Sequence, residues 1–237
     1  MTPVSPLGPV SLLGIVAALA DLVLPVDCAG CGAHGAVLCT ACAAALAVPP
    51  RPVEPVPCPA GFPPCRAVGN YAEPVRSVLL AYKERGLRVL APALGGALAR
   101  AVDTAAPPGP VLLVPIPSPA AAVRARGGDH MARLAASAAT ALRRTGRWVR
   151  VGQVLAAHGG RPDSVGLDAA SRRANRVGAF RVRSPAALHG GAGPSVVIVD
   201  DVVTTGATLA EAAHVLRSAG AGALHAAVVA ATVRRTE

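Results

Sequence analysis

The spacing of apolar and polar positions changes repeatedly along the chain, and it predicts strands that alternate with helices. Continuous apolar runs of the kind found in strands buried on both faces occur at 111–114 and at 196–199, the second within a strand expected over 195–199. Further strands are expected near 149–155, 179–182 and 224–232. Helical spacing predicts helices over 74–84, 90–103, 129–144 and 208–219. This alternation favours an α/β fold with a mainly parallel sheet flanked by helices, which binds ligands at the carboxyl ends of its strands.

The first part of the chain departs from this pattern. Residues 7–26 are apolar enough to suggest a signal peptide or a membrane span. However, no Lys or Arg precedes Arg51, and Asp21 lies near the end of the segment. Apolar residues recur there at helical spacing, at Leu12, Val16, Leu19 and Val23. We therefore predict an amphipathic helix that packs on the body of a cytoplasmic protein, with no membrane span.

Four of the six cysteines follow the spacing C-x2-C-x7-C-x2-C, at Cys28, Cys31, Cys39 and Cys42. Two short turns of this kind bring four thiolates around one tetrahedral zinc ion. Such a zinc ion would be structural, because four protein ligands leave no position for water. His34 could replace one thiolate, and two disulfides in an exported protein are the alternative. Cys58 and Cys65 are either bystanders or a second, degenerate site.

Eight prolines between residues 47 and 65 predict an extended linker or strap after the cysteine module. We therefore divide the chain into two parts. Residues 1–65 comprise the N-terminal helix, the zinc module and the Pro-rich linker, and residues 66–237 form the globular α/β domain. The sequence leaves the oligomeric state open.

The positive charge of the chain is concentrated in one window. The chain has 23 Lys and Arg against 13 Asp and Glu, a net charge of +10. Residues 124–183 hold thirteen arginines and three acidic residues, so this window carries the whole excess. It favours an anionic partner such as a phosphate ester, nucleic acid or an acidic membrane surface. Only five residues are aromatic, which argues against a protein that stacks successive bases on aromatic side chains.

Part of this charge falls at the end of the helix predicted over 129–144. Four arginines cluster there: Arg143, Arg144, Arg147 and Arg150. The helix dipole by itself favours positive charge at a helix C-terminus. Contact with nucleic acid is the alternative explanation for this cluster.

The strongest chemical signal follows the apolar strand at 195–199. Two adjacent carboxylates, Asp200 and Asp201, end the strand and can bind ribose hydroxyls or a metal ion. The loop after them contains Thr204, Thr205, Gly206, Ala207 and Thr208. Its hydroxyls and backbone amides, placed at the start of a helix, form a cradle for phosphate because the helix dipole favours an anion. An ordinary turn with a capping Thr would not explain the two acids, and the chain contains no Walker sequence.

The motif over residues 196–209 resembles the signature of type I phosphoribosyltransferases, which bind phosphoribosyl pyrophosphate. Together with the four-cysteine module, the order of motifs is similar to the ComF family of competence-associated, phosphoribosyltransferase-like proteins. The similarity covers nearly the whole chain and includes Tyr82-Lys83 and residues 114–117, 124–127 and 172–180. It implies a type I phosphoribosyltransferase-like fold with a small N-terminal zinc-binding module.

The resemblance also implies roles for individual residues. Asp200 and Asp201 would contact the ribose hydroxyls, and the loop Thr204–Thr208 would hold the 5-phosphate. Residues 156–176 would form a flexible loop that closes over the site. Three residues after Pro117 would face the pyrophosphate: Ser118, Arg124 and Arg126.

The chain departs from the family pattern at two places. It reads Arg126-Gly127-Gly128-Asp129-His130 where family members commonly read Arg-Gly-Phe-Asn-Gln. It also has Ser164 where a glutamine is often found. Because these departures affect residues that can touch the second substrate, they leave the acceptor and the catalytic competence open.

Two functional hypotheses follow. The first is an enzyme that binds phosphoribosyl pyrophosphate with Mg²⁺ and transfers the phosphoribosyl group to an unidentified acceptor, releasing pyrophosphate. Pyrophosphate departure builds negative charge on the leaving oxygens and positive charge on the ribose ring, so Mg²⁺ and arginines are needed on one side and carboxylates on the other. The alternative is a non-catalytic competence or DNA-uptake accessory protein whose arginine-rich window binds single-stranded DNA or a translocation partner.

Overall fold

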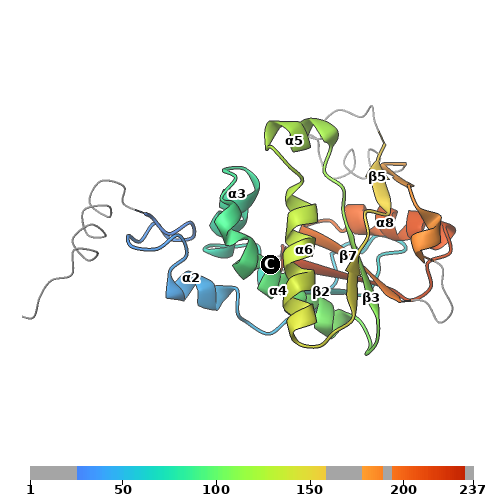
Figure 1. Ribbon diagram of the computed structural model, residues 1–237, viewed down its shortest axis with the longest axis horizontal. Helices are drawn as coiled ribbons and strands as arrows, with labels where there is room; N and C mark the ends of the chain where they lie inside the picture. Colours follow the sequence, from blue (N-terminus) through green and yellow to red (C-terminus); the bar gives the residue numbers. More distant parts are fainter. Residues whose placement is uncertain (1–25, 159–177, 189–193, 233–237) are drawn as a thin grey trace, which may run out of the picture.

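A computed structural model describes residues 26–158, 178–188 and 194–232, and it arranges them around one six-stranded sheet (Figure 1). The strand order is β1-β2-β8-β7-β3-β4. Every neighbouring pair is parallel except β1 and β2, which are antiparallel. The strands of this sheet are β1 (Arg51–Val53), β2 (Cys65–Asn70), β3 (Val111–Pro115), β4 (Val149–Val151), β7 (Ser195–Val203) and β8 (Leu224–Ala231).

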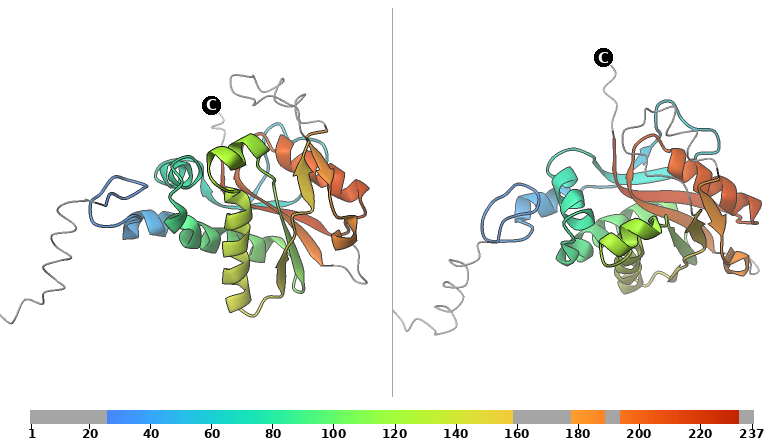
Figure 2. Two further views of the ribbon diagram at one scale, coloured as in Figure 1. Left: turned by 45° about the horizontal axis from the view of Figure 1, so that its top comes forward. Right: turned by 90° about the horizontal axis from the view of Figure 1, so that it is seen from above.

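Helices cover both faces of this sheet. One face is covered by α3 (Val75–Lys83), α4 (Ala91–Ala105) and α6 (His130–Arg144), whose apolar residues form a single buried cluster with the strands. The other face is covered by α8 (Ala207–Ser218), which Figure 2 shows on the side of the sheet opposite α4 and α6. A small antiparallel pair, β5 (Leu155–Ala157) and β6 (Phe180–Val182), packs beside α8.

Two short α-helices and two single 3₁₀ turns complete the described chain. The helices are α2 (Thr40–Ala45) and α5 (Ala120–Ala125), and the 3₁₀ turns lie at Arg88–Leu90 and Pro185–Leu188. The α2 helix belongs to the N-terminal cysteine module, which lies beside α3 at one end of the molecule (Figure 1). Within the described residues, no helix is long and apolar enough to cross a membrane.

Ala, Val and Leu form almost all of the core. Of the five aromatic residues, only Tyr82 and Phe180 are buried. The small side chains let the helices lie close to the sheet, and a long sequence of buried residues on β7 and β8 confirms the expectation of central strands covered on both faces.

The connections that follow β3 and β7 leave the sheet on opposite faces. The chain leaves β3 through α6 and returns to the sheet as β4, on one side. It leaves β7 through α8, on the opposite face, and returns as β8 on the other side. The two connections therefore diverge, and the carboxyl ends of β3 and β7 mark the topological switch point at which open α/β sheets bind ligands.

The structure corrects the sequence prediction at five places. The strand expected over 149–155 is two strands in different sheets, because the chain turns at Gly152, whose amide donates to Leu113 O over 2.9 Å. The Pro-rich segment is not only a linker, since β1 pairs with β2 at the sheet edge. The helix α5 was not predicted, nor was strand β2. The strand expected over 195–199 is longer than predicted: β7 continues through the acidic pair to Val203.

Two predicted segments lie largely outside the described residues. The expected N-terminal helix over 7–26 is one of them. The loop expected over 156–176 is the other: only residues 156–158 are described, and the first two of them belong to β5.

Candidate functional site

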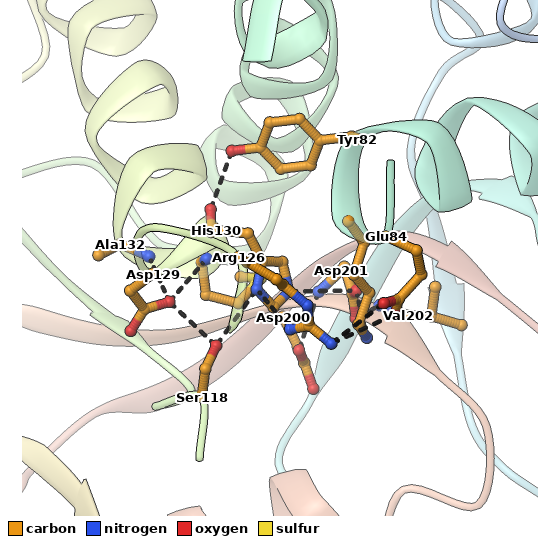
Figure 3. A network of polar contacts seen from close by, with 12 residues as sticks. Tyr82, Glu84, Ser118, Arg126, Asp129, His130, Ala132, Asp200, Asp201 and Val202 are labelled. Atoms are coloured by element: carbon orange, nitrogen blue, oxygen red, sulfur yellow. Dashed lines mark hydrogen bonds and ion pairs between the residues drawn. The ribbon is translucent and has the colours of Figure 1, made fainter. Parts of the chain in front are cut away.

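A network of polar side chains lies at the carboxyl ends of β3 and β7 (Figure 3). It draws on four separate parts of the chain. Asp201 comes from β7, Lys83 from the end of α3, His130 from the start of α6, and Ser118 from the segment after β3. These residues meet because the sheet places the switch point directly beneath the ends of α3 and α6.

Asp201 is buried at the centre of this network. Its Oδ2 atom lies 2.8 Å from Lys83 Nζ and 3.6 Å from His130 Nε2. Burial by itself would raise the pKa of Asp201, but the contacts with His130 and Lys83 hold this pKa well below its usual range. The same ion pair raises the pKa of Lys83 against the effect of burial. The lowered pKa favours the ionised form of Asp201, which lies near the carboxyl end of the central strand β7.

Asp200 has a different electrostatic environment. Its Oδ1 atom accepts a hydrogen bond from the Asp201 amide over 2.9 Å. Burial, and next the negative charge of Asp201, raise the pKa of Asp200 well above the ordinary value, while Lys83 opposes this shift. Of the two adjacent carboxylates, Asp200 is thus the one that binds a proton more readily.

His130 connects this carboxylate to the segment after β3. Ser118 Oγ lies 3.2 Å from His130 Nδ1 and donates to Asp129 Oδ1 over 3.0 Å. Asp129 is also the N-cap of α6, because the same oxygen accepts hydrogen bonds from the amides of Met131 and Ala132. Tyr82 Oη donates to His130 O over 2.9 Å. These bonds hold the ring of His130 in one place between the segment after β3 and Asp201.

The N-cap allows a direct test of this arrangement. We expect Asp129→Ala to destabilise the fold by about 1 kcal/mol, because two amides at the start of α6 lose their acceptor. Asp129→Asn should cost less, because its side-chain oxygen can still cap the helix. Urea denaturation of both variants measures the difference, and equal stability of the two would contradict the capping role.

The arginines predicted to face pyrophosphate lie in two different settings. The Arg126 guanidinium pairs with Glu84, with Nη2 at 3.3 Å from both carboxylate oxygens, and Nη1 lies 3.5 Å from His130 Nδ1. Arg126 is thus part of the network. Arg124 lies on α5 with an exposed side chain. A third arginine, Arg88, donates to Gly127 O over 2.9 Å and supports the turn between α5 and α6.

The loop predicted to hold phosphate follows β7 and leads into α8. Gly206 is the N-cap of α8 and has a left-handed backbone, with φ of 73°. Among the contacts that hold the loop, Ala210 N donates to Gly206 O over 2.9 Å, and Thr232 Oγ1 donates to Thr204 O over 3.3 Å. Thr205 Oγ1 lies 3.5 Å from the amide of Ala207. The first amides of α8 therefore stand at the carboxyl end of β7, next to the acidic pair.

The four N-terminal cysteines gather in one place. Their Sγ atoms all lie within 4.8 Å of one another, and Cys31 Sγ lies 3.6 Å from Cys39 Sγ. All four are free thiols. Burial would raise the pKa of Cys28, but amide donors, first that of Cys39, lower it to about 6. Separations of this size match the edges of a tetrahedron of sulfurs around zinc, about 3.8 Å for Zn–S bonds of about 2.3 Å. The cluster can therefore hold a metal ion such as zinc.

A glycine makes this cluster possible. A Cβ atom on Gly30 would lie 2.6 Å from Cys42 Sγ and 3.2 Å from Pro74 Cβ. Cys39 N and Gly30 N both approach Cys28 Sγ, at 3.3 and 3.4 Å. His34 takes no part, since its Nδ1 atom contacts Asp27 at 2.5 Å instead.

The other two cysteines lie on the Pro-rich segment and on β2. In the part of the chain that the structure describes, neither belongs to a group of side chains that could hold a metal ion. Cys58 is exposed, whereas Cys65 is buried and burial raises its pKa to about 12. Both line an open cavity of about 650 Å³ between the Pro-rich segment and the start of β8, with Phe62, Arg66 and His225.

The arginine cluster after α6 is partly committed to the fold. Arg143 donates to Val149 O through both Nε and Nη2, over 3.0 and 2.8 Å. Arg147 pairs with Asp103 over 2.6 Å and donates to Ala106 O over 3.1 Å. These two side chains hold the turn between α6 and β4, while Arg144 and Arg150 are exposed. The arginines predicted in the loop, Arg172, Arg173 and Arg176, lie outside the described residues.

Sequence reasoning did not assign a role to several residues of this network. Lys83 is the only lysine of the chain and lies near the end of a predicted helix, but nothing local indicated that it meets Asp201, 118 positions later. The contacts of His130 with Ser118 and Asp201, and of Glu84 with Arg126, were also missed. For the contacts of His130, the one available signal was its position directly after Asp129, a residue type that caps helices.

The fold and the site together define an α/β domain that has an acidic pair and the glycine-capped start of a helix at its switch point. Residues 154–237, just over a third of the chain, match the family model of the phosphoribosyl transferase domain. The match contains β7, the acidic pair, the loop at Gly206, α8 and β8. The fold is thus type I phosphoribosyltransferase-like, with a four-cysteine module at its N-terminus. No curated protein matches the sequence significantly.

Proposed function

We propose that this chain binds phosphoribosyl pyrophosphate together with Mg²⁺ and transfers the phosphoribosyl group to an acceptor, with release of pyrophosphate. One observation carries the proposal: β7 brings the partly buried Asp200 and the buried Asp201 next to the loop at Gly206, at the start of α8. A sugar phosphate needs acceptors for its hydroxyls and amide donors for its phosphate, and this strand and loop supply both. The family-model match over the same residues supports it.

Each end of the substrate then has a partner of the appropriate charge. Asp200 and Asp201 accept hydrogen bonds from the ribose hydroxyls, and the loop Thr204–Thr208 binds the 5-phosphate. The pyrophosphate lies toward the segment after β3, where three proposed partners are Ser118, Arg124 and Arg126. Arg126 is held by Glu84 without substrate, so pyrophosphate would compete with that carboxylate for the guanidinium.

The reaction builds negative charge on the leaving pyrophosphate and positive charge on the ribose ring. The bond between the anomeric carbon and the pyrophosphate oxygen breaks, and its electron pair leaves with the pyrophosphate, while the acceptor forms the new bond to the same carbon. Arg126 and Ser118 can stabilise the leaving oxygens, and Asp201, whose lowered pKa favours the anion, would stabilise the cationic ribose ring. Asp200 and Asp201 can share in holding Mg²⁺, which would neutralise part of the pyrophosphate charge.

The acidic pair provides the test of this proposal. We expect the protein to bind phosphoribosyl pyrophosphate only with Mg²⁺, and the double variant Asp200→Asn and Asp201→Asn to lose at least tenfold in affinity, about 1.4 kcal/mol. Isothermal titration calorimetry measures both. Asp103→Asn is the control, because Asp103 pairs with Arg147 on the outside of α4 and should leave the affinity unchanged. No binding by the native protein would overturn the proposal, and pyrophosphate release in an acceptor screen would identify the second substrate.

The non-catalytic DNA-binding alternative gains no support from the described contacts. Arg143 and Arg147 serve the fold, and Arg126 lies in the acidic network. Membership of the ComF family and a link to competence stay predictions of the resemblance. We also propose that the four-cysteine cluster holds structural zinc.

A further inference from the structure

The Pro-rich strap, residues 54–64 between β1 and β2, passes directly over the loop at Gly206. If a Cβ atom stood on Gly206, it would lie 2.7 Å from Pro55 Cγ and 2.8 and 2.9 Å from two ring atoms of Phe62. Gly206 and Pro55 are buried, and Phe62 is partly buried. The turn of the loop is therefore closed on one side by two rings from a segment about 150 positions earlier in the chain.

The strap is held at both ends and in the middle. At its ends, β1 and β2 pair with each other, with Val53 opposite Cys65. In the middle, Arg217 Nη1 on α8 donates to Gly61 O over 2.8 Å, and Phe62 N donates to Pro59 O over 3.1 Å. The ring of Phe62 also joins the apolar cluster beneath α8. These anchors fix the rings against the loop from which α8 starts.

The turn of the loop depends on a glycine. Gly206 has a positive φ, and glycine adopts positive and negative φ values about equally well. The backbone of the turn can therefore change its conformation when nothing packs against it. The amide of Ala207 lies at the limit of hydrogen-bond distance from Thr205 Oγ1, at 3.5 Å. Amides that converge on a phosphate bind it well only when they are already oriented.

We propose that Phe62 and Pro55 are positioning residues that hold the loop Thr204–Thr208 in the shape that binds the 5-phosphate. The proposal rests on the proposed function for the identity of the ligand. It assigns to the N-terminal part of the chain, outside the region that matches the phosphoribosyl transferase model, a direct role in the affinity for the sugar-phosphate end of the substrate. The pyrophosphate end lies on the other strand, after β3, and does not depend on these rings.

This separation of the two ends gives the experiment. Ribose 5-phosphate and Mg²⁺-pyrophosphate are titrated separately into the native protein and into Phe62→Ala, Phe62→Leu and Val56→Ala. We expect Phe62→Ala to weaken ribose 5-phosphate about five- to tenfold relative to pyrophosphate. Phe62→Leu should recover most of the loss, because leucine still packs on Gly206. Val56 lies on the same strap but is 71% exposed, so Val56→Ala should change neither affinity.

The ratio of the two affinities is the decisive quantity. Loss of packing at Phe62 also lowers the free energy of unfolding, but an unfolded fraction reduces both affinities equally and leaves their ratio unchanged. An unchanged ratio in Phe62→Ala, or a ratio that favours ribose 5-phosphate, would overturn the proposal. The second outcome would mean that the strap obstructs the loop.

Hydrogen exchange separates this proposal from the proposed function. We expect the amides of residues 206–208 to exchange at least tenfold faster in Phe62→Ala than in the native protein, while those of β3 keep their protection. Faster exchange without any binding of either ligand would retain the positioning role and overturn the proposed function. Binding with unchanged exchange and an unchanged ratio would overturn the positioning role alone.

Discussion

Removal of one thiol from the four-cysteine cluster, by Cys42→Ser, is expected to release one zinc ion per chain and to unfold residues 28–46. Cys42 is buried, and its thiol lies within 4.8 Å of the other three. Apparent binding free energies for structural zinc reach about 10–16 kcal/mol, which is far more than so short a segment can gain from its own core. Metal analysis of the purified protein should find about one zinc per native chain and almost none per variant chain.

The effect should reach the main domain. Ala29 and Leu46 belong to the same buried cluster as α3 and α4, and Leu46 O accepts a hydrogen bond from Arg100 on α4. When the module unfolds, this part of the cluster becomes exposed to water. We expect the melting temperature to fall by roughly 10 °C, since about 3 kcal/mol corresponds to that shift in a domain of this size.

Two controls make this result specific. Cys58→Ser removes an exposed thiol outside the cluster and should leave both the zinc content and the melting temperature unchanged. Hydrogen exchange should increase over residues 28–46 in Cys42→Ser and remain slow in β3, β7 and β8. A full complement of zinc in Cys42→Ser, or disulfides in place of free thiols in the native protein, would contradict the metal site.

Much of the secondary structure could be predicted because its signals are local. The helices over α3, α4, α6 and α8 begin and end within two residues of the predicted bounds, since the 3.6-residue spacing of apolar side chains is a property of each segment by itself. The acidic pair and the cysteine spacing were also visible locally. By contrast, β1 was missed because a Pro-rich segment has a weak strand signal, and an edge strand is one of the few places in a sheet that tolerates proline.

The contacts that shape the site could not be predicted in the same way. Lys83 meets Asp201, and Phe62 packs on Gly206, only because α3 and the strap cross the ends of the sheet in three dimensions. Nothing in the spacing of residues near Lys83 differs from that of any exposed lysine at a helix end. The two-strand split near Gly152 has the same origin, because it depends on which partner strand lies beside each half.

Replacement of the single lysine by an apolar side chain of similar length, Lys83→Met, is expected to destabilise the protein by about 2 kcal/mol at neutral pH. The substitution leaves the buried charge of Asp201 without its closest partner. Breaking a fully buried pair costs about 3–5 kcal/mol, and we expect less here because a third of the Lys83 side chain is exposed to solvent. Lys83 also lowers the pKa of Asp200, so its loss makes ionisation of both carboxylates less favourable.

The pH dependence identifies the cause of this loss. The pKa of Asp201 is lower in the folded chain than in the unfolded chain, so its interactions stabilise the fold above the unfolded pKa and are lost as the pH falls. Without Lys83 the folded pKa of Asp201 rises, and protonation of Asp201 relieves the unpaired charge. The difference between native protein and Lys83→Met should therefore be largest near pH 7.5 and should shrink toward pH 4, as measured by urea denaturation at each pH.

The same helix offers the matched control. Arg76 on α3 pairs with Glu73 over 3.3 Å, but both side chains are about half exposed. Arg76→Met removes a cation of the same helix at the surface and should change the stability by less than about 1 kcal/mol at either pH. Lys83→Arg, which keeps the charge, should retain part of the stability lost in Lys83→Met. An equal loss at pH 7.5 and pH 4 would mean that the side chain of Lys83 acts through packing and not through the charge of Asp201.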